Sequence, residues 1–214
     1  MRSPVLQPLM KDHVTLYVFV SVLFVVGVVF GALLVNALTL DQQQDLAADV
    51  QQFVQRIQEG MVPDGGQSLW ERALFHAKWL ILIWVLGLTV VGMPVILGLD
   101  FLKGVLVGFA VGTLVSQHSW KGLLFSLMSV APQNLLVVPA MLIASVSAVS
   151  FSIYIVRNRL LNRYGTIGQP FAQHTATGAL MLLVAVAAAM VESFVSPVLL
   201  KWAAPLILGY GSGL

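Results

Sequence analysis

Charged residues are scarce in this sequence of 214 residues. Lys, Arg, Asp and Glu make up 9% of it, whereas an ordinary soluble domain contains about 25%. Four stretches, 13–40, 79–99, 122–156 and 164–191, contain none of them. Each exceeds the roughly 18 to 20 apolar residues with which a helix crosses the hydrocarbon of a bilayer. The sequence therefore predicts an all-α integral membrane protein.

Cysteine is absent altogether, which excludes a disulfide framework and a thiolate metal site. The net charge of +2 comes from residues spread thinly along the chain, so there is no basic stripe for nucleic acid. The sequence has neither a G-x-x-x-x-G-K-[ST] phosphate loop nor an H-E-x-x-H zinc motif. Its four histidines stand singly near the ends of predicted spans, where interfacial packing explains them. We therefore expect no metal, no other cofactor and no nucleic-acid partner.

We expect a single polytopic membrane domain over residues 1–214, with about five transmembrane helices. The predicted spans are about 14–38, 78–99, 101–117, 135–156 and 175–200. Pro94 should bend the second span or end it, because a proline ring removes one donor and crowds the carbonyl four residues back.

The uncharged stretch between the third and fourth predicted spans is too long for one straight crossing, and it contains Pro132 and Pro139. We expect a broken helix there, with a half-helix or re-entrant piece over 119–131 and an irregular link at Pro132, Gln133 and Asn134. Non-helical backbone at membrane depth must be buried in protein or line a wet cavity. The side-chain amides of Gln133 and Asn134 could supply the missing hydrogen bonds.

Residues 39–76 form the one sizeable polar segment. Apolar side chains recur in it at spacings of three and four residues, which indicates an amphipathic helix. Thr39 and Gln42 make a weak capping pair at its start, and a capping box at Ser68 and Glu71 predicts a new helix that continues into the membrane.

Basic residues indicate the orientation. Arg157, Arg159 and Arg163 lie between the fourth and fifth predicted spans, and basic loops usually stay cytoplasmic. Five spans then place the N-terminus in the cytoplasm, and they place segment 39–76 and the C-terminus outside a cell membrane.

Glycines recur at every fourth position in the third predicted span, at Gly104, Gly108 and Gly112, and Gly27 and Gly31 form a similar pair in the first. Such faces let another helix approach closely in lipid. For the pair in the first span we favour internal packing. The pattern in the third span does not say whether its partner is the same chain or a second copy, and it could serve a homodimer.

Glu192 is the one acid well inside a predicted span, and a charge at a helix centre costs about 2.5 to 3.5 kcal/mol on insertion scales. It therefore needs a partner or a proton. One interpretation is an ion or proton site. The other, which we favour, is a buried glutamate that is protonated, hydrogen-bonded to a neighbouring helix or reaching the outer interface. Asp100 and Lys103, at a predicted helix entrance, are expected to form a local ion pair at the inner interface.

Three segments carry a further pattern. They are Phe101-Leu102-Lys103-Gly104 with the glycines that follow, Pro132-Gln133-Asn134-Leu135 with Pro139 and a small-residue run to Phe151-Ser152, and Glu192-x-x-x-Ser196-Pro197. The pattern resembles the stage II sporulation protein M family of endospore-forming bacteria. The resemblance covers essentially the whole chain and is most specific between residues 100 and 152.

The resemblance implies a non-enzymatic membrane scaffold for engulfment, when the mother-cell membrane migrates around the forespore. It also implies two partners, the peptidoglycan hydrolases stage II sporulation proteins D and P, recruited into one complex at the septal membrane. No catalytic residue transfers. The family positions that do transfer, with no role assigned, are Pro132, Gln133, Asn134, Glu192, Ser196 and Pro197.

A function of another class stays open. A permease or lipid-handling channel would use the broken helix and Glu192, as transporters use interrupted helices and intramembrane acids. The predicted span lengths show no inverted repeat, which argues against it. An intramembrane hydrolase would need a paired nucleophile and base, which the sequence does not offer.

Overall fold

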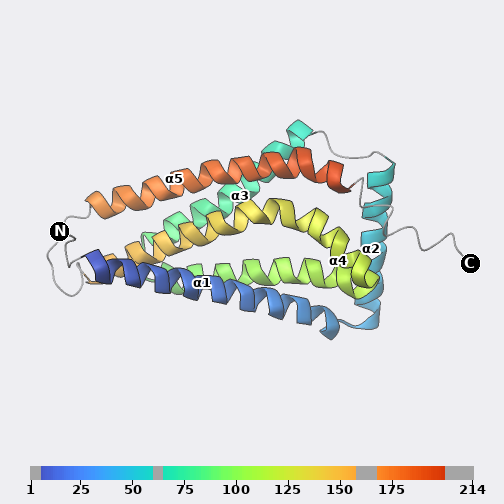
Figure 1. Ribbon diagram of the computed structural model, residues 1–214, viewed down its shortest axis with the longest axis horizontal. Helices are drawn as coiled ribbons and strands as arrows, with labels where there is room; N and C mark the ends of the chain where they lie inside the picture. Colours follow the sequence, from blue (N-terminus) through green and yellow to red (C-terminus); the bar gives the residue numbers. More distant parts are fainter. Residues whose placement is uncertain (1–5, 60–64, 158–167, 201–214) are drawn as a thin grey trace, which may run out of the picture.

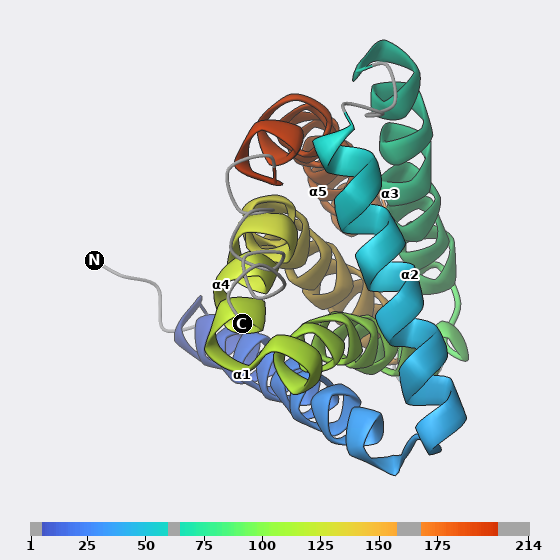
Figure 2. The same ribbon diagram turned by 90° about the vertical axis from the view of Figure 1, so that its right-hand side faces the viewer.

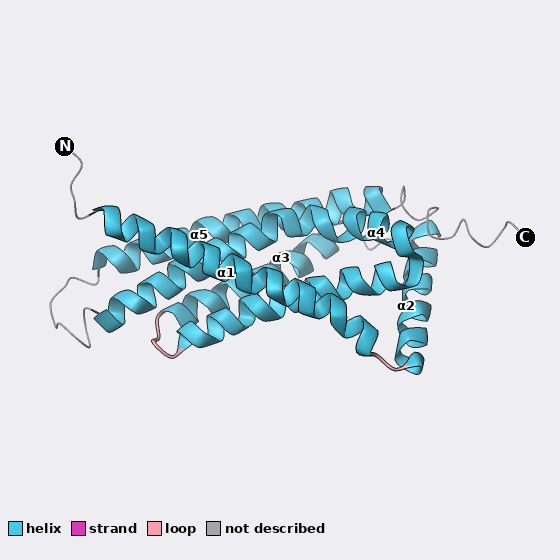
Figure 3. Ribbon diagram, turned by 60° about the horizontal axis from the view of Figure 1, so that its bottom comes forward, coloured by secondary structure: helices cyan, strands magenta, loops and turns pink. Residues whose placement is uncertain are grey.

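Long α-helices account for nearly all of the chain that the structure, a computed structural model, describes: residues 6–59, 65–157 and 168–200 (Figure 1). The α-helices are α1 (Leu6–Leu34), α2 (Leu40–Gln58), α3 (Gly65–Gly87), α4 (Gly92–Ile155) and α5 (Gly168–Met190). A short 3-10 helix, η1 (Val35–Ala37), follows α1, and a π-helical turn, η3 (Val191–Val195), follows α5. No strand occurs within these ranges (Figure 3). The all-α prediction is confirmed.

Four of the helices run along the length of a bundle, and α2 lies across one end of it (Figures 1 and 2). Four segments are long and apolar enough to cross a membrane: Val14–Ala37, Gly92–Gln117, Asn134–Ile155 and Gly168–Leu200. Helix α3 is not among them, because it carries Glu71, Arg72 and Lys78, although it packs in the same bundle. The count of five spans stays a prediction.

The second predicted span, 78–99, is wrong as a single helix. Helix α3 ends at Gly87 and α4 begins at Gly92. The Thr89 hydroxyl accepts a hydrogen bond from the Gly92 amide (3.0 Å), while the Ser152 hydroxyl reaches the carbonyl oxygens of Gly87 (2.9 Å) and Thr89 (3.1 Å). Pro94 lies in the first turn of α4, where a helix needs no donor from it. The proline marks a helix start here.

The predicted irregular link at Pro132, Gln133 and Asn134 is also wrong, because α4 is helical through both of its prolines. The Asn134 side-chain amide donates to the Val130 carbonyl (2.7 Å), and the side chain of Gln133 lies outside the described part. Prolines are tolerated in membrane helices when neighbouring groups compensate for the lost bond.

The break lies at Ser119, at the boundary between the predicted third span, 101–117, and the predicted half-helix, 119–131. Ser119 has φ 48° and ψ −126° and is the only described non-glycine residue with a positive φ. The break divides α4 into a first arm, 92–118, and a second arm, 120–155. The chain reverses here, so the two arms run in opposite directions along the bundle (Figure 1).

The predicted glycine faces meet one another inside the chain. A methyl group added at Gly27 would overlap the Phe101 carbonyl oxygen, and one added at Gly108 would overlap the Val28 carbonyl oxygen. The same close approach occurs at Gly31 and Gly104. Helix α1 therefore covers the face that the sequence could have offered to a second copy.

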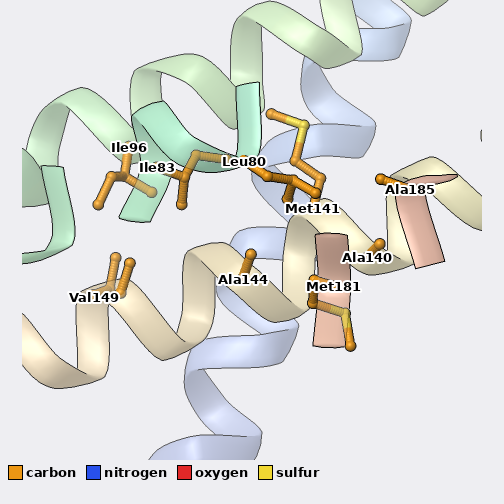
Figure 4. Packing of buried hydrophobic residues seen from close by; sticks show 10 residues of the cluster. Leu80, Ile83, Ile96, Ala140, Met141, Ala144, Val149, Met181 and Ala185 are labelled. Carbon is orange, nitrogen blue, oxygen red and sulfur yellow. The ribbon is translucent and has the colours of Figure 1, made fainter. Parts of the chain in front are cut away.

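The second arm of α4 forms the centre of the bundle. More than half of its apolar window is buried (56%), against 28% or less in the other three candidate spans. Small residues on the second arm let α3, α5 and the first arm of α4 approach closely. The second arm contributes Met141 and four alanine or valine side chains to a core of ten buried residues (Figure 4). The buried members are Leu80, Ile83, Ile96, Ala140, Met141, Ala144, Ala148, Val149, Met181 and Ala185.

Helix α2 is amphipathic, as predicted. Its first turn is closed by a reciprocal cap, in which the Thr39 amide donates to the Gln42 side chain (3.1 Å) and the Gln42 amide donates to the Thr39 hydroxyl (3.4 Å). Leu46 and Val50 are partly buried, while Asp45 on the opposite side is exposed.

Candidate functional site

Glu192 binds two basic side chains of α3. Its carboxylate lies 2.5 Å from the Arg72 guanidinium and 3.0 Å from Nε2 of His76. Arg72 and His76 are four residues apart, so they project from the same side of the helix. The predicted hydrogen bond from Glu192 to a neighbouring helix is therefore present, and it is an ionic one.

The chain around Glu192 is widened into the π-helical turn Val191–Val195. Pro197 follows that turn, and a proline ring crowds the carbonyl four residues back, which here belongs to Ser193. The wider turn relieves that crowding. Within the described part, the buried hydroxyls of Ser193 and Ser196 have no hydrogen-bond partner. Widened turns of this kind are frequent at functional sites.

Lys103 of the first arm of α4 lies close to the same region. Its ammonium lies 5.9 Å from the centre of the Phe75 ring. A cavity of about 10 Å³ beside it is lined by residues of α3, both arms of α4 and α5: His76, Trp79, Leu80, Lys103, Val137, Met141 and Ala185. That space suits about one water molecule. We call Arg72, His76, Lys103 and Glu192 the charged cluster.

Asp100 does not pair with Lys103, so the predicted local ion pair is wrong. The Asp100 side chain is fully buried (0% exposed) and accepts a hydrogen bond from the Ser145 hydroxyl (2.8 Å). Its second carboxyl oxygen, Oδ2, has no partner among the described residues. Because α4 begins at Gly92, both residues lie well inside the helix and not at its entrance.

His174 joins three helices at the other end of α3. Its ring lies parallel to Phe151, 5.2 Å away, and to Trp84, 6.3 Å away. Its nitrogens lie 3.1 Å from the Ser147 hydroxyl and 3.3 Å from the Trp84 carbonyl oxygen. His76 and His174 are both buried and each contacts a neighbouring helix. Their position at the membrane interface stays a prediction.

The sequence pointed to Glu192 and missed its partners. The helix predicted from the capping box at Ser68 and Glu71 includes Arg72 and His76, but their charge led the predicted span to begin only at Lys78, so both fell in the predicted extracytoplasmic segment. A sharper signal was present: an acid in a span needs a cation, and Arg72 and His76 have helical spacing. Pro132 and Asn134 lie on the second arm of α4, and Ser196 and Pro197 follow the π turn.

In the described ranges, no group of three or more His, Cys, Asp or Glu side chains could hold a metal ion. The charged cluster combines two basic side chains, one carboxylate and one imidazole. Such a set can hold an anionic group or carry a proton.

Among known proteins, the family model for stage II sporulation protein M matches residues 20–197. The match extends from the first membrane helix to the π turn and includes the whole charged cluster. No curated protein and no solved structure is similar enough to count as a match.

Proposed function

Because the chain belongs to the stage II sporulation protein M family, we propose that it is a non-enzymatic membrane scaffold for engulfment. Membership makes it a sporulation-related membrane protein. In the proposed role, it recruits peptidoglycan hydrolases, the stage II sporulation proteins D and P, to the septal membrane of the mother cell. Its N-terminus would lie in the cytoplasm and α2 on the side of the cell wall.

The family match over residues 20–197 is the observation that carries this proposal. The form of the bundle supports it. Helix α2 lies across one end, with Asp41, Asp45 and Asp49 exposed along it. A wall-side partner would find a polar helix there, whose first half lies against the end of the first arm of α4.

Recruitment can be tested in sporulating cells that carry fluorescent fusions of the two hydrolases. We expect both fusions to collect at the septum when the chain is present, to disperse when it is deleted, and to co-purify with its tagged form. A variant with Asp45→Lys and Asp49→Lys should recruit less than one with Gln51→Lys and Gln55→Lys. Hydrolases that reach the septum equally well without the chain would refute the proposal.

A permease or lipid-handling channel is the second candidate, and it now rests on the charged cluster alone, since the helix is continuous at Pro132. Purified protein in liposomes, with and without Glu192→Gln, tests it. Ion or lipid flux that is lost in Glu192→Gln would favour the permease over the scaffold.

A further inference from the structure

Lys103 lies near the middle of its membrane helix. The span Gly92–Gln117 places it about 16 Å from the first residue and about 21 Å from the last, at a rise of 1.5 Å per residue. A hydrocarbon core is about 30 Å thick. Lysines near helix ends can extend to the headgroups, but one at this depth is far from both interfaces.

No carboxylate within the described part of the chain lies within ion-pair distance of Lys103. Asp100 faces Ser145 on the second arm of α4, and Glu192 is held by Arg72 and His76. The contact that Lys103 does make is with the Phe75 ring. An ammonium has three donors and no acceptor, so an aromatic face does not complete its coordination.

The face around Lys103 is accessible and apolar. On the α3 side it carries Phe75, which is 51% exposed, and on the first arm of α4 it carries Leu102 and Leu106, which are 45% and 50% exposed. Lys103 itself is partly buried, with the Phe75 ring on one side and the small internal cavity on the other. Charged residues inside a membrane usually face a protein partner or a cavity, and they mark functional sites.

A carboxylate from another protein fits this face best. In the four candidate spans of a second copy the only acids are Asp100, which is fully buried, and Glu192, which is already paired. Glu71 of α3 lies about 9 Å from the first residue of its helix, against about 16 Å for Lys103, and so lies less deep. A phospholipid phosphate lies at the interface, about 15 Å from the bilayer centre. An acidic residue in a transmembrane helix reaches this depth without distorting the bilayer.

We propose that the face formed by Phe75, Leu102, Lys103 and Leu106 binds a transmembrane helix of a different protein, through a carboxylate that pairs with Lys103. The inference rests on the proposed scaffold function and deepens it by assigning a partner-binding surface within the membrane. The bound helix would cover the exposed apolar walls and neutralise the ammonium.

A synthetic membrane peptide tests the face without a known partner. The absence of cysteine allows Ser116→Cys to carry a donor dye, and the protein is placed in phosphatidylcholine liposomes with a Leu/Ala helix that carries one central Glu and an acceptor dye. Interhelical polar contacts in model peptides predict that the Glu peptide binds about tenfold more tightly than its Gln counterpart. Energy transfer between the dyes measures that binding.

Two substitutions make the result specific. Lys103→Met keeps the length of the side chain and should remove the preference for Glu, whereas Lys78→Met, which removes an exposed lysine of α3, should leave it intact. Thermal unfolding of each variant in detergent shows whether it is folded, and Lys103→Gln serves as a second variant if the methionine form is not.

Equal binding of the Glu, Gln and all-apolar peptides would overturn the proposal. A Glu preference that survives Lys103→Met would do the same. The face binds lipid instead if added phosphatidylglycerol displaces the Glu peptide completely and, in the absence of any peptide, shields the Lys103 ammonium from an amine-reactive reagent. The assay contains no hydrolase, so its failure is distinct from a failure of recruitment in cells.

Discussion

At the scale of single residues, the bundle interior contains paired and unpaired charge side by side. Glu192 pairs with Arg72 and His76, whereas Lys103 contacts only the Phe75 ring and the second oxygen of Asp100 has no hydrogen-bond partner among the described residues. Placing charge away from water is costly, so an arrangement of this kind needs compensation from a neighbour or a partner.

Breaking the Arg72–Glu192 pair should destabilise the bundle. Glu192→Gln leaves the Arg72 guanidinium without the carboxylate that now pairs with it, and loss of one partner of a buried pair costs about 3 to 5 kcal/mol. We expect the lower end, because the Arg72 side chain is 33% exposed. Unfolding in detergent measures the loss.

A double-mutant cycle separates the pair from the two side chains. Adding Arg72→Met to Glu192→Gln should recover part of the lost stability, because the uncompensated cation is gone. Strictly additive losses would show that the two side chains do not interact.

The hydrogen bond from Ser145 to Asp100 offers a second residue-scale prediction. Ser145→Ala leaves a fully buried carboxyl group without the donor that now serves it, which should cost about 1 to 3 kcal/mol. Ser116→Ala, on the same helix but exposed, is the control. If the two variants unfold at the same temperature, the Asp100 contact contributes nothing.

At the scale of elements, close packing of α1 on the first arm of α4 holds the two helices together. Gly108→Ala should cost about 1 to 3 kcal/mol, because the added methyl group meets the Val28 backbone in a packed interface. Gly98→Ala, on the same helix with nothing within 4 Å of the added atom, should be neutral or stabilising. Chemical unfolding of both variants provides the comparison.

The same substitution distinguishes internal packing from a dimer. Because the face is covered by α1, the protein should keep the same oligomeric state in Gly108→Ala, measured by light scattering in detergent. A change from dimer to monomer would instead restore the prediction of a homodimer through this face.

The break in α4 is a second feature at this scale. Ser119 has a backbone conformation that L side chains rarely adopt, and such residues cost about 1 to 3 kcal/mol each. Ser119→Gly should therefore stabilise the protein, and Ser119→Val should destabilise it. Thermal unfolding of the two variants shows whether each substitution raises or lowers the stability of the protein. If Ser119→Val stabilised the protein, the backbone at residue 119 would not be strained, and the prediction would be wrong.

At the scale of the whole molecule, the long uncharged stretches were enough to predict a helical membrane protein, because hydrocarbon admits few other structures. Glycine spacing correctly marked close helix packing but could not choose the partner. Proline was taken as the breaker at Pro94 and Pro132, whereas the chain turns at residues 88–91 and at Ser119. Only the second of these turns coincides with a predicted boundary, the one between the third span and the half-helix. Arg72 and His76 were placed in water because their contact with Glu192 spans more than a hundred residues, which local patterns cannot reveal.

The central claim is that α3, despite its charges, crosses the membrane with the rest of the bundle. Single-cysteine labelling with an impermeant maleimide tests it directly, since the chain has no cysteine of its own. Asp49→Cys on α2 should react in intact spheroplasts, whereas Leu82→Cys, which is 44% exposed on the outside of the bundle, should stay unreactive even after permeabilisation because lipid covers it. Labelling of Leu82→Cys as fast as Asp49→Cys would contradict the account.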